Sequence, residues 1–167
     1  MSVPGAAYFV TGCIVGRQSV LAVPVIAHAI RAHWKESDAT GDTATFAATV
    51  MPDHFHWFFQ LGERLTLGRV LAKFKVRTKA SLHNVNASWQ RDFFEHRLRS
   101  ADSSEEYGIY IFMNPYRARL VTTDATWLGW HCPDPSRFRF TMLLDEVGCP
   151  PREWLELPER EDLHVGE

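Results

Sequence analysis

The chain has 167 residues, of which 46% are hydrophobic, and this length and composition describe one globular domain with a buried core. No apolar run approaches the roughly 20 residues that a membrane span requires, and no internal repeat or low-complexity segment occurs. The formal net charge of −2 neither favours nor excludes a nucleic-acid partner.

The first half of the chain predicts a strand, a helix and a pair of strands. Residues 8–15 are β-branched and aromatic, which is typical of a strand. Pro24 suits the first turn of a helix, and apolar residues follow it at helical spacing. Residues 45–51 and 54–61 read as strands, and the short Pro52-Asp53 turn between them predicts a hairpin.

The second half predicts helix, strand and helix. Residues 65–82 have a helical apolar stripe, and residues 89–98 read as a fourth strand. Ser103 and Glu106 have the spacing of a capping box, which opens a helix that Pro115 should end or kink near Asn114. The order β-α-β-β-α-β-α predicts an α+β sandwich, with a four-stranded antiparallel sheet and the helices packed on one face.

Beyond Val121 the periodic pattern weakens. Five prolines break this region, at positions 133, 135, 150, 151 and 158. We therefore expect a domain over residues 1–121 and an irregular C-terminal appendage over 122–167. The last dozen residues are acidic, and we expect them to lack fixed structure.

The cysteines and the N-terminus indicate a compartment. Cys13, Cys132 and Cys149 are few, odd in number and far apart, and no CxxC pair occurs. This pattern fits a reduced cytoplasm better than a disulfide framework. The N-terminus also lacks the charged start and apolar stretch of a signal peptide. We expect a cytoplasmic protein.

Two histidines stand two apart in the stretch VMPDHFHWFF. Residues i and i+2 of a strand point to the same face, so His54 and His56 should project side by side while Phe55 and Trp57 point the other way. Two adjacent imidazoles can chelate one divalent ion. A pair of histidines on a solvated strand face is the alternative, and the spacing alone names no reaction.

The stretch YGIYIFMNP carries a second candidate group. Tyr110 and Asn114 are four apart, so they lie one turn apart on the same face of a helix. A tyrosine can act as a covalent nucleophile in phosphoryl transfer, with Asn114 as a possible third metal ligand. Tyr107 shares that side of the helix and is the alternative nucleophile; an amphipathic-helix tyrosine with a structural role is the other interpretation.

Three segments, MPDHFHW, WQRDFFEHRLR and YIFMNPYRARLV, together resemble the small single-tyrosine HUH transposases, most of all the REP-associated tyrosine transposases. The resemblance runs from about Tyr8 to Val121. It implies a ferredoxin-like fold, metal ligands at His54, His56 and Asn114, and a nucleophile at Tyr110.

The same resemblance implies an activity. Such proteins cut single-stranded DNA, form a 5′-phosphotyrosine with a free 3′-OH, and rejoin strands by the reverse step. Mg²⁺ or Mn²⁺ is the expected ion, single-stranded or hairpin DNA is the expected partner, and association with the nucleoid follows. Both monomers and homodimers occur in the family. The chain departs from the family at Arg119, where a Gly is frequent, and in the segment after Val121.

Basic residues concentrate in the middle of the chain, with nine Lys and Arg between Arg64 and Arg99 against Asp92 and Glu95. Phosphate contacts from such side chains give affinity for nucleic acid that depends on salt. A solvated basic helix face is the alternative. The predicted DNA-binding residues are Arg69, Lys73, Lys75, Arg77, Lys79, Arg97 and Arg117.

Three functions therefore remain open at this point. The leading one is a metal-dependent DNA strand transferase. The second is a non-catalytic hairpin DNA- or RNA-binding domain of the same fold. The third is an unrelated metal-dependent phosphodiesterase in which Tyr110 is structural.

Overall fold

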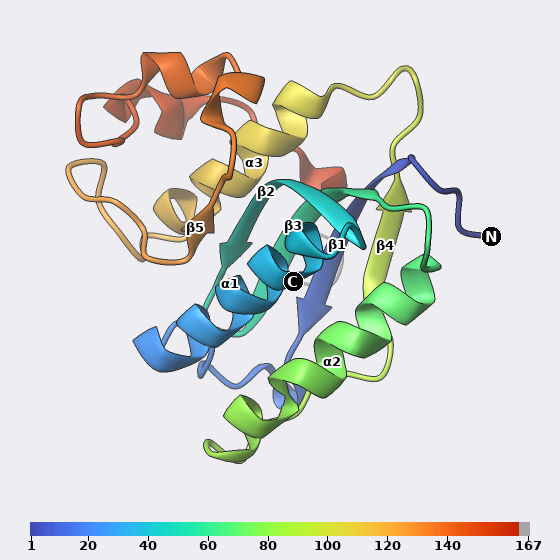
Figure 1. Cartoon of the computed structure of the whole chain (residues 1–167). Coiled ribbons are helices and arrows are strands. Elements are labelled where there is room, and N and C mark those ends of the chain that lie inside the picture. Colours follow the sequence, from blue (N-terminus) through green and yellow to red (C-terminus); the bar gives the residue numbers. More distant parts are fainter. Residues whose placement is uncertain (164–167) are drawn as a thin grey trace.

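A five-stranded sheet with the strand order β4-β1-β3-β2-β5 organises the fold, and all of these neighbours are antiparallel (Figure 1). The structure is a computed structural model and describes residues 1–163. The predicted hairpin and antiparallel α+β sheet are confirmed. The strands are β1 (Ala7–Cys13), β2 (Thr43–Val50), β3 (His54–Leu61), β4 (Phe94–Arg97) and β5 (Trp130–His131).

The helices cover both faces of the sheet (Figure 1). Helices α1 (Pro24–Ala39) and α2 (Leu67–His83) share a core with Phe55, Trp57 and Phe59 of β3. Helix α3 (Ser104–Arg117) shares a second core with Phe58, on the other face of the same strand. The prediction of helices on one face is therefore wrong for α3. Both faces of β3 carry large apolar side chains, and each must be covered.

Helix α3 begins directly after the capping residue that the sequence predicts. The Ser103 hydroxyl accepts a hydrogen bond from the Glu106 N–H at 3.4 Å, as a capping residue does.

Among the helices within residues 1–163, none combines the length and the apolar character that a membrane crossing requires.

The segment after Val121 packs onto the domain. Strand β5 pairs with Ala48 and Thr49 of β2, which makes the predicted count of four strands one too low. Phe138 and Phe140 are buried in the α3 core. Gly108 permits this contact, because a Cβ at that position would lie 2.4 Å from the Phe138 ring.

The acidic end of the chain is partly ordered. The short 3-10 helix Glu161–Leu163 places Leu163 in the α3 core, with 2% of its surface exposed. The expectation of a structureless final dozen residues is therefore wrong up to Leu163. His164, for which the sequence offers no role, lies outside the described residues.

Helix α3 continues past Pro115 and ends at Arg117, so the predicted end near Asn114 is wrong. The Leu120 N–H donates to the Pro115 carbonyl at 3.0 Å, and the Arg119 N–H donates to the Tyr116 carbonyl at 3.0 Å. These two bonds form a Schellman motif, which requires a left-handed residue directly after the C-cap. Arg119 occupies that place with φ of +59°, where the family that the sequence resembles frequently has Gly.

Replacing Arg119 by glycine should stabilise the fold by about 1 kcal/mol, because glycine adopts the left-handed conformation without the steric cost of a Cβ. Chemical denaturation measures the change in the free energy of unfolding. Arg119→Ala is the matched control, since it removes the guanidinium but keeps the Cβ. A gain of the same size in the alanine variant would show that charge, not backbone conformation, is responsible.

Candidate active site

The two histidines lie side by side on the α3 face of the sheet. Cys13 of β1 pairs with His54, and Thr11 pairs with His56. Directly opposed residues of paired strands share a face. His54 and His56 are both buried, and their ring centroids are 4.9 Å apart. The strand alternation inferred from the sequence therefore holds.

Each histidine has a hydrogen-bond partner at Nδ1. Thr11 Oγ1 lies 2.8 Å from His56 Nδ1, and Asp53 Oδ1 lies 2.7 Å from His54 Nδ1. In the tautomer with the proton on Nδ1, each ring donates to its oxygen partner and presents the Nε2 lone pair to the site. This arrangement is the usual one for histidines that bind a metal ion.

Asp53 is held as a carboxylate between two donors. Its hydrogen bond with His54 lowers the pKa of Asp53 to about 2, with Arg17 adding to the effect and burial opposing it. Arg17 Nε donates to Asp53 Oδ2 at 2.8 Å, and its Nη1 donates to Cys13 Sγ at 3.2 Å. Arg17 reaches this position from a left-handed backbone, with φ of +55°.

Helix α3 brings Asn114 and Tyr110 to the histidines. Asn114 Nδ2 lies 3.4 Å from His56 Nε2. A half-turn of the amide would place its oxygen at the same point, since the two ends of the group are nearly the same size. The Tyr110 ring packs edge-on to the His56 ring at 5.4 Å between centroids. Four predicted site residues, His54, His56, Tyr110 and Asn114, therefore meet.

Tyr107 lies elsewhere on α3. Its ring contacts Phe9, Phe58 and His96, and burial raises its pKa. His96 of β4 stacks on this ring, and its Nε2 lies 3.4 Å from Asp102 Oδ2. The geometry therefore places Tyr110 rather than Tyr107 against the histidine pair.

The Tyr110 hydroxyl lies under the C-terminal segment. It donates to the Leu163 carbonyl at 3.3 Å, and the residue is 2% exposed. A hollow of about 260 Å³ lies beside it, lined in part by Arg117, Pro158 and Arg160. Little of Tyr110 is therefore open to a substrate in this arrangement.

The donor set suits a hard or borderline divalent cation. Within residues 1–163 no group of three His, Cys, Asp or Glu side chains could hold a metal ion. The Asn114 amide would be the third donor, and imidazole nitrogen with amide oxygen fits Mn²⁺ or Mg²⁺ better than a thiolate-preferring metal. His54, His56 and Asn114 are thus the residues that would hold the ion.

Replacing Asp53 by alanine should weaken Mn²⁺ binding by roughly 10- to 100-fold, because His54 loses the acceptor that fixes its tautomer and orientation. Isothermal titration calorimetry with MnCl₂ measures this directly. Asp92→Ala, at an exposed carboxylate, is the control and should leave the Kd unchanged. An equal Kd for Asp53→Ala and the unaltered chain would show that Asp53 does not position His54.

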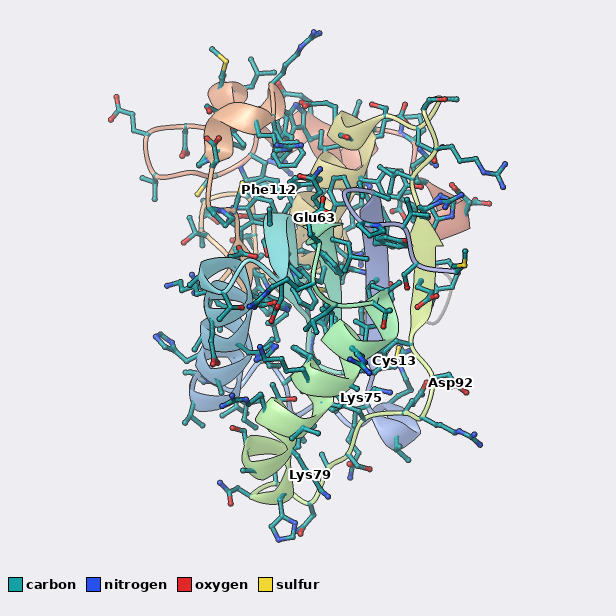
Figure 2. All side chains as sticks on the ribbon, turned by 45° about the vertical axis from the view of Figure 1, so that its right-hand side comes forward. Cys13, Glu63, Lys75, Lys79, Asp92 and Phe112 are labelled. Carbon is teal, nitrogen blue, oxygen red and sulfur yellow. The ribbon has the colours of Figure 1, made fainter. Side chains whose placement is uncertain are left out.

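The predicted DNA-binding residues lie mostly on the other face of the sheet. Lys75 and Lys79 project from α2 (Figure 2). Arg97 pairs with Tyr8, whose side chain belongs to the core of α1 and α2. Arg117 alone of the seven lines the hollow next to Tyr110.

Internal contacts occupy several of these cations. Lys73 Nζ lies 2.7 Å from Asp42 Oδ2, and Arg77 lies 3.7 Å from Glu36. Lys75 donates to the Gln90 carbonyl at 3.1 Å, and burial lowers its pKa. Arg69 and Lys79 are exposed. A role for the seven in DNA binding stays a prediction.

Sequence reasoning did not single out Thr11, Asp53 or Arg17. Asp53 could have been found, because it directly precedes His54 in the chain. Thr11 becomes a candidate only through the pairing of β1 with β3, and Arg17 only through the fold of the loop after β1.

No protein-family model matches the chain, and no curated protein matches it either. Solved structures do match it. A REP-associated tyrosine transposase bound to a REP hairpin covers 78% of this chain and 78% of its own, with a TM-score of 0.66 and 21% identity. A candidate transposase from Deinococcus radiodurans covers 59% of this chain and 82% of its own, with a TM-score of 0.49 and 14% identity.

The first of these structural similarities shows that this chain has the fold of a tyrosine transposase. More particularly, it is shared with a REP-associated tyrosine transposase, in agreement with the family that the three sequence segments resemble.

Proposed function

We propose that the chain is a metal-dependent enzyme that cuts and rejoins single-stranded DNA at hairpin ends through a 5′-phosphotyrosine at Tyr110. One observation carries the proposal. His56 Nε2 lies 3.4 Å from the Asn114 amide, and the His56 and Tyr110 rings make a T-shaped contact, so a histidine pair suited to a metal ion and a phenol share one site. A protein that does not cut and rejoin DNA would not need this combination of two histidines, an asparagine and a tyrosine.

The reaction that this set supports is a transesterification. Tyr110 Oη attacks the phosphorus, the bond from phosphorus to the 3′ oxygen breaks, and the leaving oxygen takes up a proton. The phenolic proton passes to water. The phosphodiester bond is conserved as a phosphotyrosine, and attack by a free 3′-OH reverses the step, so no nucleotide cofactor is required.

The residues around the phenol have separate tasks. Thr11 and Asp53 fix the two imidazoles through Nδ1. Arg117, in the hollow beside Tyr110, would hold a phosphate of the bound strand. A divalent cation on His54, His56 and Asn114 would polarise the scissile phosphate and offset its charge.

Hairpin DNA is the proposed substrate for two reasons. The sequence segments resemble a family that acts on such DNA, and the solved structure with the shared fold is bound to a REP hairpin. The 21% identity leaves the recognised DNA sequence open to experiment.

A second candidate is a hairpin-binding domain that does not cut. The burial of the Tyr110 hydroxyl and its bond to Leu163 favour this alternative. Incubation with labelled hairpin DNA and Mn²⁺, followed by a denaturing gel, separates the functions. A slower protein band supports the transferase, free cleaved DNA without that band supports a phosphodiesterase, and uncut DNA supports the binding domain.

A further inference from the structure

Helix α1 carries a basic hollow on its outer face, away from the histidine pair. His28, Arg31 and Lys35 are three and four residues apart, so they share one side of the helix. With Ala32 they line a space of about 130 Å³, and no carboxylate contributes to the lining. Nothing in the sequence pattern groups His28 with other functional residues. We call this space the α1 hollow.

Arg31 is fixed in place at the α1 hollow. Its Nη1 donates to the Leu128 carbonyl at 3.1 Å. Its Nε is buried and has no hydrogen-bond acceptor within residues 1–163. A guanidinium that is already immobilised loses less conformational entropy when it binds an anion.

The positive charge at the α1 hollow is not neutralised by neighbours. Burial, with the positive charges of Arg31 and Lys35 adding to the effect, lowers the pKa of His131 to about 4. Glu36, which follows Lys35, lies instead toward Arg77 of α2. Three cations of α2, Lys73, Lys75 and Arg77, have carboxylate or carbonyl partners. Arg31 and Lys35 have no carboxylate partner within residues 1–163.

The α1 hollow lies toward the same end of the sheet as the candidate active site. The loop after β1 is tied to the β2–β3 turn, since the Leu21 N–H donates to the Pro52 carbonyl at 2.8 Å. This loop leads directly into α1. Leu128, the anchor of Arg31, precedes Gly129, whose carbonyl accepts from the Val50 N–H at 3.1 Å. A strand that passes the β5 edge could therefore contact both places.

We propose that the α1 hollow binds a phosphate group of the DNA backbone that flanks the cleaved strand. This inference rests on the proposed function for the identity of the ligand. Three basic side chains around one space, one of them immobilised and none paired with a carboxylate, form a site for a phosphate oxyanion. The α1 hollow would hold the DNA while Tyr110 acts on it.

The test is the salt dependence of hairpin-DNA binding, measured by fluorescence anisotropy from 50 to 300 mM NaCl as a chosen range. The Arg31→Gln/Lys35→Gln variant should bind about tenfold more weakly at low salt, and its log–log salt slope should be shallower by about one. The matched control is Arg91→Gln/Arg139→Gln, which removes two exposed positive charges elsewhere and should change the Kd less than twofold.

Two results would overturn the inference. One is an equal effect of both double variants, which would show a general effect of net charge. The other is an unchanged Kd and an unchanged salt slope in both double variants. A further arm titrates the chain with millimolar inorganic phosphate and follows the His28 signals by NMR. If phosphate shifts these signals while the Arg31 and Lys35 substitutions leave the DNA affinity unchanged, the site binds free phosphate and not DNA.

The covalent-adduct assay, run in parallel, separates this inference from the proposed function. Because neither Arg31 nor Lys35 belongs to the Tyr110 site, the double variant should form the adduct at the unaltered rate with saturating DNA. A weaker Kd in a chain that forms no adduct would leave the α1 hollow standing and refute the enzyme. If the double variant forms the adduct and its Kd for DNA is unchanged, the proposed enzyme is supported and the α1 hollow is refuted as a DNA-binding site.

Discussion

Replacing Tyr110 by phenylalanine should abolish the covalent adduct between the protein and hairpin DNA. The variant keeps the ring that packs against His56 and Phe9 and removes only the hydroxyl. No other tyrosine ring contacts the histidine pair within the described chain. We expect no adduct band at any time point in a denaturing gel with Mn²⁺, while DNA affinity measured by anisotropy stays within about twofold.

Tyr107→Phe is the matched control on the same helix. Its ring packs against Phe58 and His96 rather than against the His56 ring in the described chain, so the adduct should form at close to the unaltered rate. An adduct that survives in Tyr110→Phe and disappears in Tyr107→Phe would reverse the assignment. Loss in both variants with intact thermal melting would show that the two phenols act together.

Replacing His56 by alanine should reduce DNA cleavage by at least about a thousandfold, because the site loses one of its proposed metal ligands and the neighbour of the Asn114 amide. Binding of the hairpin should persist, since His56 is wholly buried and contacts no phosphate in the proposed arrangement. Calorimetry with MnCl₂ should show loss of the metal site, and chelation by EDTA should reproduce the cleavage defect in the unaltered chain.

His96→Ala controls for the loss of an imidazole on the same face of the sheet. Within residues 1–163, His96 has its ring contact with Tyr107 and its side-chain hydrogen bond with Asp102 rather than with the histidine pair. Its replacement should leave cleavage within about threefold. Equal loss of cleavage and DNA binding in His56→Ala, with a lowered melting temperature, would show that the histidine pair is structural.

The local geometry of the site was predictable from the sequence. Strand alternation puts His54 and His56 on one face, and helical spacing puts Tyr110 and Asn114 one turn apart. These relations depend only on residues close together in the chain. The hairpin was predictable for the same reason, because a short turn joins β2 and β3.

Relations between distant segments were not predictable. The sequence does not state that α3 covers the face of β3 opposite α1 and α2, because both faces of that strand are apolar. Nor does it reveal that Asp42 pairs with Lys73, 31 residues away, which removes a cation from the predicted DNA-binding set. Long-range pairing likewise adds β5 to the sheet.

The C-terminal segment has the same kind of long-range role. Leu163 is far from Tyr110 in sequence, yet its carbonyl accepts the hydrogen bond of the phenol. Nothing in the acidic composition of this segment indicates such a contact. In the proposed reaction the Tyr110 oxygen would have to exchange this hydrogen bond for the attacked phosphate.

Mass spectrometry of the trapped protein–DNA adduct tests the central claim most directly. After digestion with nuclease and trypsin, the peptide of residues 100–117 should carry a nucleotide through its 5′ phosphate, and fragmentation should place it on Tyr110. A nucleotide on Tyr107 or Tyr116, or cleaved DNA with no modified peptide, would contradict the account.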